Sequence, residues 1–330
     1  MHGKVAGKSR LEPLDLARGL ALVAMAIYHF AWDLEFFGYA PPGMTAVGGW
    51  KLFARCIASS FLIIVGISLY LGHADRLRVR PFLRRLALVA GAALAISLVT
   101  WFAVPGGFIF FGILHQIALA SVMGLLFLRR PWPLTLIAAA LVVGAPWYLR
   151  STFFDAPVWW WVGLSSHDPP SNDYVPLFPW FGAVLAGIAL ARLAHGSGLI
   201  DKARVELGDW SSPFQFIGRH SLVFYLLHQP VLIGIVYMMS VVVPPEPRSQ
   251  AAEFDAACQA SCAATRGAAF CTSYCACVYD RLDAENGLDA AFSNDQDAEQ
   301  TAMLNEIAAM CTFDAEAGQP DGAGEEPPSE

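Results

Sequence analysis

Charged side chains are scarce in this chain of 330 residues. Asp, Glu, Lys and Arg make up 15% of it and hydrophobic residues 56%, and the mean hydropathy is +0.47. These values are far too apolar for an ordinary soluble domain, so the composition excludes that class of protein.

Cysteine is almost absent from the first 257 residues, where Cys56 stands alone within an apolar run. We interpret it as a small buried hydrophobic residue. The chain also lacks a glycine-rich phosphate-binding loop and the ligand spacing that is typical of metal sites. We therefore expect no metal ion to take part in its function.

Long apolar runs, in contrast, are abundant, and their lengths are near the roughly 20 residues that span a bilayer. Seven such runs lie at about 14–37, 52–72, 86–104, 107–128, 133–149, 174–194 and 219–243. The fifth is the shortest and contains Pro146. The sequence thus predicts an all-α fold, a polytopic membrane helix bundle of about seven transmembrane helices with a cysteine-containing extracytoplasmic C-terminal tail.

The placement of Lys and Arg between these runs predicts the orientation, because basic residues favour the cytoplasmic side. With a cytoplasmic N-terminus, fifteen of the 18 basic residues before position 244 fall on that side. Only Lys51, Arg55 and Arg150 fall on the other. Seven spans then place the C-terminus outside.

Residues 244–330 differ sharply in composition from the rest. They hold 17 acidic and 3 basic residues, whereas residues 1–243 hold 11 acidic and 18 basic ones. The prolines of VVVPPEP mark the boundary. We predict a transmembrane domain at 1–243 and an acidic, disulfide-bearing external tail at 244–330, whose end, GQPDGAGEEPPSE, is expected to be disordered.

Six of the seven cysteines lie in this tail: Cys258, Cys262, Cys271, Cys275, Cys277 and Cys311. An external location favours disulfides. The first two cysteines, like the third and fourth, are four residues apart and share a helix face. Two short helices could be joined 258–275 and 262–271, which leaves 277 and 311 to pair, and this is one of 15 connectivities. A thiolate metal site is less favoured, because it usually has tighter C-x-x-C spacing.

The first apolar run contains five ionisable residues, namely Asp15, Arg18, His29, Asp33 and Glu35. At about 100° per residue, Arg18 and His29 lie within about 20° of one helix face and about 16 Å apart along the axis. The two aspartates share this face, which Leu22 and Met25 interrupt, and Glu35 points away. Because ionisable groups in a membrane are costly unless paired or hydrated, four on one face favour a polar cavity over two local pairs.

Later apolar runs carry further polar residues. FGILHQIALAS places His115 and Gln116 in the fourth run, and HSLVFYLLHQPV places Tyr225 and His228 on one face of the seventh. Pro230 lacks an N–H, so we expect a free carbonyl at Leu226 beside His228. Each histidine alone is equally well explained as a packing residue, but three together favour a cavity.

The pattern D-x-x-R-G-x9-H, formed by Asp15, Arg18, Gly19 and His29, resembles the signature of membrane-bound acyltransferases. Four segments extend the resemblance in order: LDLARGLALVAMAIYHFAWDLEFFG, FGILHQIALAS, DYVPLFPWFGAVLAGI and IGRHSLVFYLLHQPVL. They resemble bacterial relatives of the heparan-alpha-glucosaminide N-acetyltransferase catalytic domain over most of residues 10–240. The tail is not part of this pattern, and animal homologues have more spans and a luminal domain.

The resemblance implies a membrane acyltransferase that transfers an acyl group, usually acetyl, from cytosolic acyl-CoA to a sugar or amino sugar on the far side. His29 would be the catalytic histidine, acting as a base or as the acyl acceptor, with Asp33 orienting its ring. Arg18, at the donor end, would bind the phosphates of the donor acetyl-CoA together with Arg84 and Arg85. Membrane topology alone, however, explains most of the basic residues between 76 and 85.

On the acceptor side, the candidate cavity residues are His115, Gln116, Asp173, Tyr225 and His228. Asp173 is also a candidate cap for the sixth helix. Three consecutive tryptophans at 159–161 either stack on a sugar or, as we favour, form an interfacial aromatic belt.

The expected partners are acyl-CoA, a sugar-type acceptor and the lipid bilayer of a bacterial inner (plasma) membrane. No nucleic acid is expected, and a homodimer is left open.

Two other functions remain open as well. One is a non-catalytic transporter or permease that uses the intramembrane His and Asp residues as a proton relay. The other is a membrane anchor that presents the tail.

Overall fold

The fold is all-α, as predicted. The computed structural model describes residues 11–203, 205–245, 250–263, 265–285, 287–288, 291 and 297–317, and these contain helices and no strand. The α-helices are α1 (Glu12–Phe36), α2 (Gly48–His73), α3 (Val79–Ala103), α4 (Ile113–Gly124), α5 (Trp132–Leu149), α6 (Leu177–Gly196), α7 (Leu199–Lys202), α8 (Ser212–Arg219), α9 (Ser221–Val242), α10 (Gln250–Cys262), α11 (Ala268–Ala284) and α13 (Ala298–Ala317). The segment predicted to be disordered, 318–330, lies outside the described residues.

Short 3-10 helices occupy several connections between these helices. They are η1 (Met44–Ala46), η2 (Pro105–Gly107), η3 (Leu125–Phe127), η4 (Thr152–Asp155), η5 (Pro157–Val162) and η6 (Asp209–Ser211). The three tryptophans lie in η5, where Trp160 donates a hydrogen bond to the carbonyl of Asp155 over 2.8 Å. Their rings pack against Phe110, Phe111 and Phe153.

The chain divides into two compact units. The first consists of Met1–His29 and Leu52–Leu232, and the second of Phe30–Lys51 and Ile233–Glu330. The sequence placed its single boundary at residue 243, whereas this division assigns the last turns of α1 and α9 to the second unit.

Among the described residues, six helices are long and apolar enough to cross a membrane, namely α1, α2, α3, α5, α6 and α9. The remaining predicted span, the fourth at 107–128, corresponds to a shorter apolar helix, α4 continued by η3. Many large side chains on these helices face outward, among them Leu94, Leu98, Leu141 and Val231. Apolar surface of this kind suits contact with lipid, and the chain is a multi-pass membrane protein.

Two predicted boundaries were wrong in ways that affect the site. The third run was predicted to begin at 86, but α3 already begins at Val79. Its first turns carry arginines, which lower the hydropathy without breaking the helix. The fourth run was predicted to begin at 107, but α4 begins only at Ile113, because the glycine- and proline-containing segment before it forms η2 and extended backbone.

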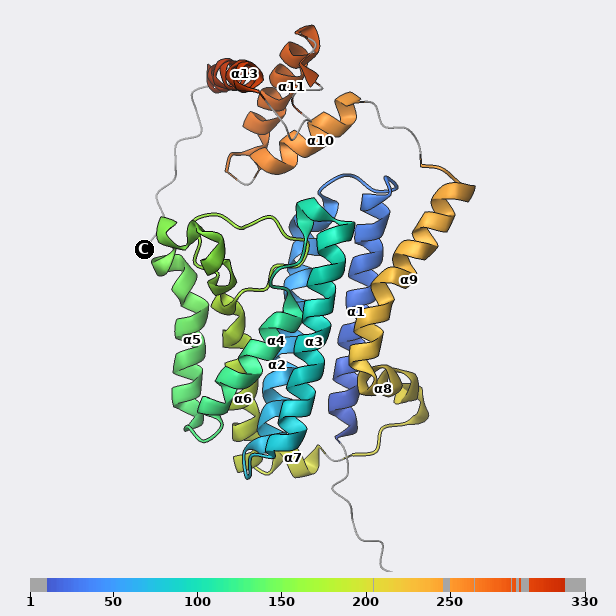
Figure 1. Cartoon of the computed structure of the whole chain (residues 1–330), viewed down its shortest axis with the longest axis vertical. Helices are drawn as coiled ribbons and strands as arrows, with labels where there is room; N and C mark the ends of the chain where they lie inside the picture. The colour runs from blue at the N-terminus through green and yellow to red at the C-terminus, as the bar shows by residue number, and fades with distance from the viewer. Residues whose placement is uncertain are drawn as a thin grey trace, which may run out of the picture. The chain divides into compact units, whose positions relative to one another are not determined.

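The first unit is packed through close helix contacts at glycines. Figure 1 shows α2, α3, α4 and α6 in the middle of the bundle, with α5 beside α6 at one edge. A Cβ atom on Gly66 of α2 would lie 2.1 Å from the carbonyl oxygen of Val184, and one on Gly187 of α6 would lie 2.2 Å from that of Ile63. Only glycine permits this approach, which is a common way for membrane helices to pack.

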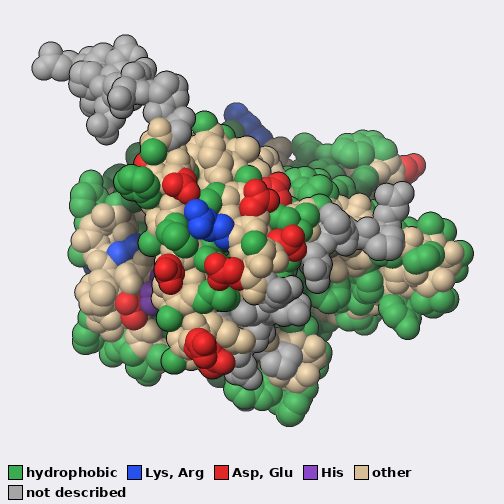
Figure 2. All heavy atoms as spheres, turned by 90° about the horizontal axis from the view of Figure 1, so that it is seen from above, with side chains coloured by type: hydrophobic (Ala, Val, Ile, Leu, Met, Phe, Trp, Pro, Cys, Tyr) green, Lys and Arg blue, Asp and Glu red, His purple; other side chains and the backbone are tan. Residues whose placement is uncertain are grey.

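The tail helices α10, α11 and α13 pack around a small core of Leu282, Ile307 and Cys311. Three disulfides join them, Cys258–Cys275, Cys262–Cys271 and Cys277–Cys311. This is the connectivity that the sequence offered as one of 15. In the view of Figure 2, acidic side chains are spread over the visible face, and few basic side chains lie between them.

Candidate active site

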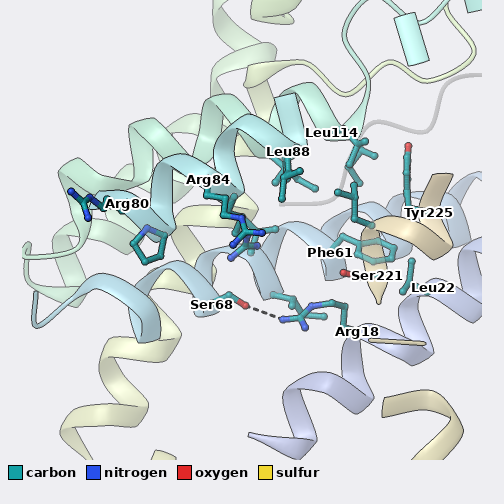
Figure 3. A pocket seen from close by; sticks show the side chains of 18 residues that line it. Arg18, Leu22, Phe61, Ser68, Arg80, Arg84, Leu88, Leu114, Ser221 and Tyr225 are labelled. Carbon is teal, nitrogen blue, oxygen red and sulfur yellow. Dashed lines mark hydrogen bonds between the residues drawn. The ribbon is translucent and has the colours of Figure 1, made fainter. Parts of the chain in front are cut away.

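A cavity of about 610 Å³ lies within the first unit, between α1, α2, α3, α4 and α9. Figure 3 shows Arg80 and Arg84 toward one end of it and Phe61, Leu114 and Tyr225 toward the other. Its size is that of a typical small-molecule site. The lining is therefore basic at one end and apolar at the other.

Arg18 is fixed at the wall of this cavity by three partners. Its guanidinium lies 3.0 Å from the carboxylate of Asp15, and it donates to the hydroxyl of Ser68 over 3.2 Å and to the carbonyl of Gly218 over 3.3 Å. Helices α1 and α8 approach closely here, since a Cβ on Gly19 would lie 1.9 Å from the carbonyl oxygen of Phe214. In the R-G pair, Arg18 supplies the positive charge and Gly19 allows α8 to approach α1. The sequence did not single out Ser68, whose only signal is a polar residue within an apolar run.

Three arginines of α3, Arg80, Arg84 and Arg85, also line the cavity. They were predicted to lie in a loop, but the early start of α3 places them on a helix. None of them forms an ion pair with a carboxylate in the part of the chain that the structure describes. Arg85 and Arg18 are close enough for their positive charges to repel. Several guanidinium groups without carboxylate partners favour an anionic ligand, phosphate above all.

His29 and His228 form a hydrogen-bonded pair. Nδ1 of His29 lies 2.6 Å from Nε2 of His228. The ring centroids are 4.9 Å apart and the ring planes differ by 14°, so the rings lie nearly edge to edge in one plane. Nδ1 of His228 in turn lies 2.7 Å from the carbonyl oxygen of Tyr225. The carbonyl that His228 contacts is thus that of Tyr225, one residue before the Leu226 carbonyl that Pro230 was expected to leave free.

The cavity does not include every predicted member of the α1 stripe. Arg18 and Leu22 line it, whereas His29 and Asp33 do not. The buried side chains of Leu22 and Met25 pack with the half-buried Phe61 and Tyr225 at this point. The polar cavity that the four ionisable groups favoured therefore includes Arg18 but not His29 or Asp33, because the apolar residues that interrupt the stripe close it. Asp33, predicted to orient His29, is fully buried, and the hydrogen-bond partner of Nδ1 of His29 is His228.

His115 and Gln116 were predicted cavity residues, but neither lines it. Nδ1 of His115 accepts from the N–H of Gly112 over 3.2 Å, at the start of α4, and its Nε2 lies 3.2 Å from the hydroxyl of Ser97. Both ring nitrogens are therefore engaged in capping α4 and joining it to α3. Gln116 is fully buried on the same helix.

Asp173 was predicted to cap the sixth helix, but it caps the fourth. Its carboxylate accepts from the N–H of Ile113 over 2.9 Å at the N-terminus of α4, and it also accepts from the hydroxyl of Tyr225. Burial raises the pKa of Asp173, and the two hydrogen bonds oppose this rise. Tyr225 thus joins three parts of the site, since its ring lines the cavity, its hydroxyl binds Asp173 and its carbonyl binds His228.

Two further features, possible metal ligands and the cysteine of the bundle, do not contribute to this cavity. The described residues contain no group of three His, Cys, Asp or Glu side chains that could hold a metal ion. Cys56 was expected to be buried, but it is a free thiol on the exposed surface of α2. A small apolar residue suits a lipid-facing helix surface as well as a core, which explains the error.

These features define a class, that of polytopic helical membrane proteins with an arginine-lined cavity and a histidine pair inside the bundle. The family model described as "Heparan-alpha-glucosaminide N-acetyltransferase, catalytic" matches residues 10–230. The chain belongs to this family, which confirms the resemblance seen in the sequence. Comparison with the curated proteins and with the solved structures gives no significant match. The matched region ends before the tail, and membership supports a membrane N-acetyltransferase-like function.

Proposed function

We propose that this protein is a membrane acetyltransferase that takes the acyl group from acyl-CoA at the arginine end of the cavity and transfers it to a sugar or amino sugar from the opposite side of the membrane. The observation that carries this proposal is the cavity itself, with four arginines in a lining that is otherwise largely apolar. In the proposed orientation, the N-terminus and these arginines face the cytoplasm of a bacterial cell. The acidic, disulfide-joined tail lies outside its inner membrane, where disulfides persist.

The cavity residues fit an acyl-CoA donor. Arg80, Arg84 and Arg85 have no carboxylate partner among the described residues, so their donors are available to the phosphates. The apolar lining farther in, with Leu88 and Leu114, suits a flexible chain that carries few charges. A bound acyl-CoA supplies an activated thioester, and the protein must hold that group near a base.

His29 is the proposed base or acyl acceptor. It lies two turns beyond Leu22 on α1, about 10 Å farther along the axis. The thioester can reach it only if the apolar side chains of Leu22 and Met25, which close the cavity at this point, move aside. Asp33, on the next turn of α1, is the proposed residue that stabilises the charged form of His29.

The first experiment tests His29 in membranes that contain the full chain. With labelled acetyl-CoA and a panel of amino sugars, the wild-type protein should transfer acetyl, and His29→Ala should lower kcat by a factor of about 100 or more. The matched control is His167→Ala, since His167 is an exposed loop residue outside the site. Unchanged turnover in His29→Ala would remove His29 from the mechanism.

The second experiment tests the donor end. Arg84→Gln and Arg85→Gln should each raise the KM for acetyl-CoA about tenfold, because each loses a charge-assisted contact of roughly 1.5 to 3 kcal/mol. Arg78→Gln is the control, since Arg78 precedes α3 and does not line the cavity. Equal KM values in all three variants would contradict a phosphate site here. Proton-coupled solute uptake without acetyl transfer would instead favour the transporter alternative.

A further inference from the structure

The three histidines that the sequence placed within the spans, His29, His115 and His228, differ in how their ring nitrogens are engaged. Both nitrogens of His115 and both nitrogens of His228 have partners. His29 uses only Nδ1, and in the described part of the chain its Nε2 has no hydrogen-bond partner. Taken as a whole residue, His29 is half-buried. Of the six ring nitrogens of these three histidines, Nε2 of His29 is therefore the one without a hydrogen-bond partner among the described residues.

The hydrogen bonds of the pair determine where the protons lie. A carbonyl oxygen can only accept, so Nδ1 of His228 must carry the proton that it donates to Tyr225. The Nε2 atom of a neutral His228 then has a lone pair and must accept. Nδ1 of His29 is accordingly the donor in the 2.6 Å contact, which leaves the lone pair of His29 on Nε2.

The neutral state of both rings follows from their surroundings. Neither His29 nor His228 forms an ion pair with a described carboxylate. An unpaired charge inside a membrane bundle costs about 2.5 to 3.5 kcal/mol on insertion scales. A resting imidazolium at either ring is therefore disfavoured.

We propose that His228 is a positioning residue that holds His29 as the Nδ1–H tautomer, so that Nε2 of His29 is the atom that takes the proton in the transfer. The tautomer depends only on the histidine pair, whereas the role of Nε2 rests on the proposed acyl transfer. Selecting a histidine tautomer through a second group is how the orienting member of a catalytic triad acts.

The transfer step balances with these two residues. The lone pair of the acceptor N–H or O–H group forms a bond to the acyl carbon, the C–S bond of the thioester breaks, and the acceptor proton goes to Nε2 of His29. The charge on His29 is stabilised through Nδ1–H by His228, whose own N–H is held by the carbonyl of Tyr225. The leaving thiolate then takes the proton from Nε2, and His29 returns to its neutral form.

The decisive measurement is the ¹⁵N spectrum of the histidine rings in the full chain, labelled at histidine and held in lipid nanodiscs. We expect His29 and His228 to show a protonated Nδ1 and an unprotonated Nε2, and His115 to show the reverse. The signals are assigned by comparison with His29→Gln and His228→Gln. A protonated Nε2 on His29 in the wild-type protein would overturn the proposal, whether or not acyl transfer is ever observed.

Two substitutions of His228 test its effect on activity. His228→Ala should lower kcat on the order of 100-fold while the KM for acetyl-CoA stays within about twofold, because the arginine end of the cavity is unchanged. His228→Gln should recover most of kcat, because its amide oxygen can accept from Nδ1 of His29. His220→Ala, an exposed residue between α8 and α9, is the control.

The outcomes separate the two proposals. Full kcat in His228→Ala, or equal losses in His228→Ala and His228→Gln with both proteins folded, would contradict a positioning role. If the wild-type protein transfers no acetyl group to any acceptor, the proposed function fails, and the ¹⁵N spectrum still decides the tautomer.

Discussion

The membrane bundle and the C-terminal tail are both helical, but different forces hold them together. Within the first unit, α2 and α6 approach through Gly66 and Gly187 until backbone touches backbone. In the tail, three disulfides join three short helices around a small core. In lipid, the hydrophobic effect does not drive helices together, so close packing must do so. A small acidic unit, in contrast, has too little core to be stable without covalent links.

The bundle and the tail also differ in how they hold their ionisable groups. The bundle holds some of its ionisable side chains in fixed positions through hydrogen bonds, as at Arg18 and His228. The tail carries its charges on the surface, where they can remain hydrated (Figure 2). Chemistry that needs an oriented base is thus expected in the bundle and not in the tail.

Loss of the disulfides should have the largest effect and should be confined to the tail. Removing a native disulfide from a small domain costs about 2 to 5 kcal/mol, and Cys277–Cys311 closes the longest loop, with a separation of 34 residues. Reduction, or Cys277→Ser with Cys311→Ser, should make residues 250–317 sensitive to protease while the bundle resists. The measurement is a proteolysis time course in detergent micelles.

The same sample tests whether the bonds form at all. A membrane-permeant maleimide should label the free Cys56 before and after reduction, and the tail cysteines only after it. Immediate labelling of all six tail cysteines would contradict external disulfides. Acetyl transfer that survives the loss of the tail would also exclude the anchor alternative.

A methyl group added where α2 contacts α6 should give the next largest loss of stability, and this loss should be confined to the bundle. In Gly66→Ala the new Cβ would lie 2.1 Å from the carbonyl oxygen of Val184, so the helices must separate. We expect a loss of about 1 to 3 kcal/mol, the usual cost of overpacking. Gly72→Ala in the same helix is the matched control, because nothing lies within 4 Å of a Cβ there. Equal melting temperatures for the two variants in detergent would mean that this contact does not stabilise the bundle.

The sequence predicted the helices of the bundle well, because the length and polarity of a membrane span are local properties of the chain. It placed the arginines of α3 in a loop, since hydropathy falls wherever charge occurs even when the helix continues. The residues that resemble the family signature, Arg18 and His29, were found through their spacing. The disulfide connectivity was among the predicted options because four of the six cysteines are spaced by one helical turn.

What the sequence could not predict are contacts between distant segments. Nothing local indicates that Asp173 caps α4 and not the helix that follows it, or that His29 pairs with His228 across 199 positions. Asp33 was the natural local candidate, one turn from His29. The choice between these partners depends on how α1 and α9 are rotated, which is a property of the assembled bundle.

Replacement of Asp173 should have the smallest effect, and the effect should depend on pH. Because burial raises its pKa, the folded protein binds a proton at Asp173 more tightly than the unfolded chain does. The resulting stabilisation is present below the ordinary value of 3.8 and is lost as the pH rises through the pKa of the folded state. Asp173→Asn keeps an acceptor for Ile113 and Tyr225 but cannot ionise.

The stability difference between wild-type and Asp173→Asn proteins should therefore shift in favour of the variant as the pH rises from about 4 to 7. We expect the change at pH 7 to be about 1 kcal/mol or less, since the hydrogen bonds are retained. Thermal unfolding in detergent at several pH values measures it. Asp168→Asn is the control, because the side chain of Asp168 is 73% exposed. If the variant's advantage grew toward low pH instead, the carboxyl group of Asp173 would be stabilised in its charged form, and its two hydrogen bonds would outweigh burial.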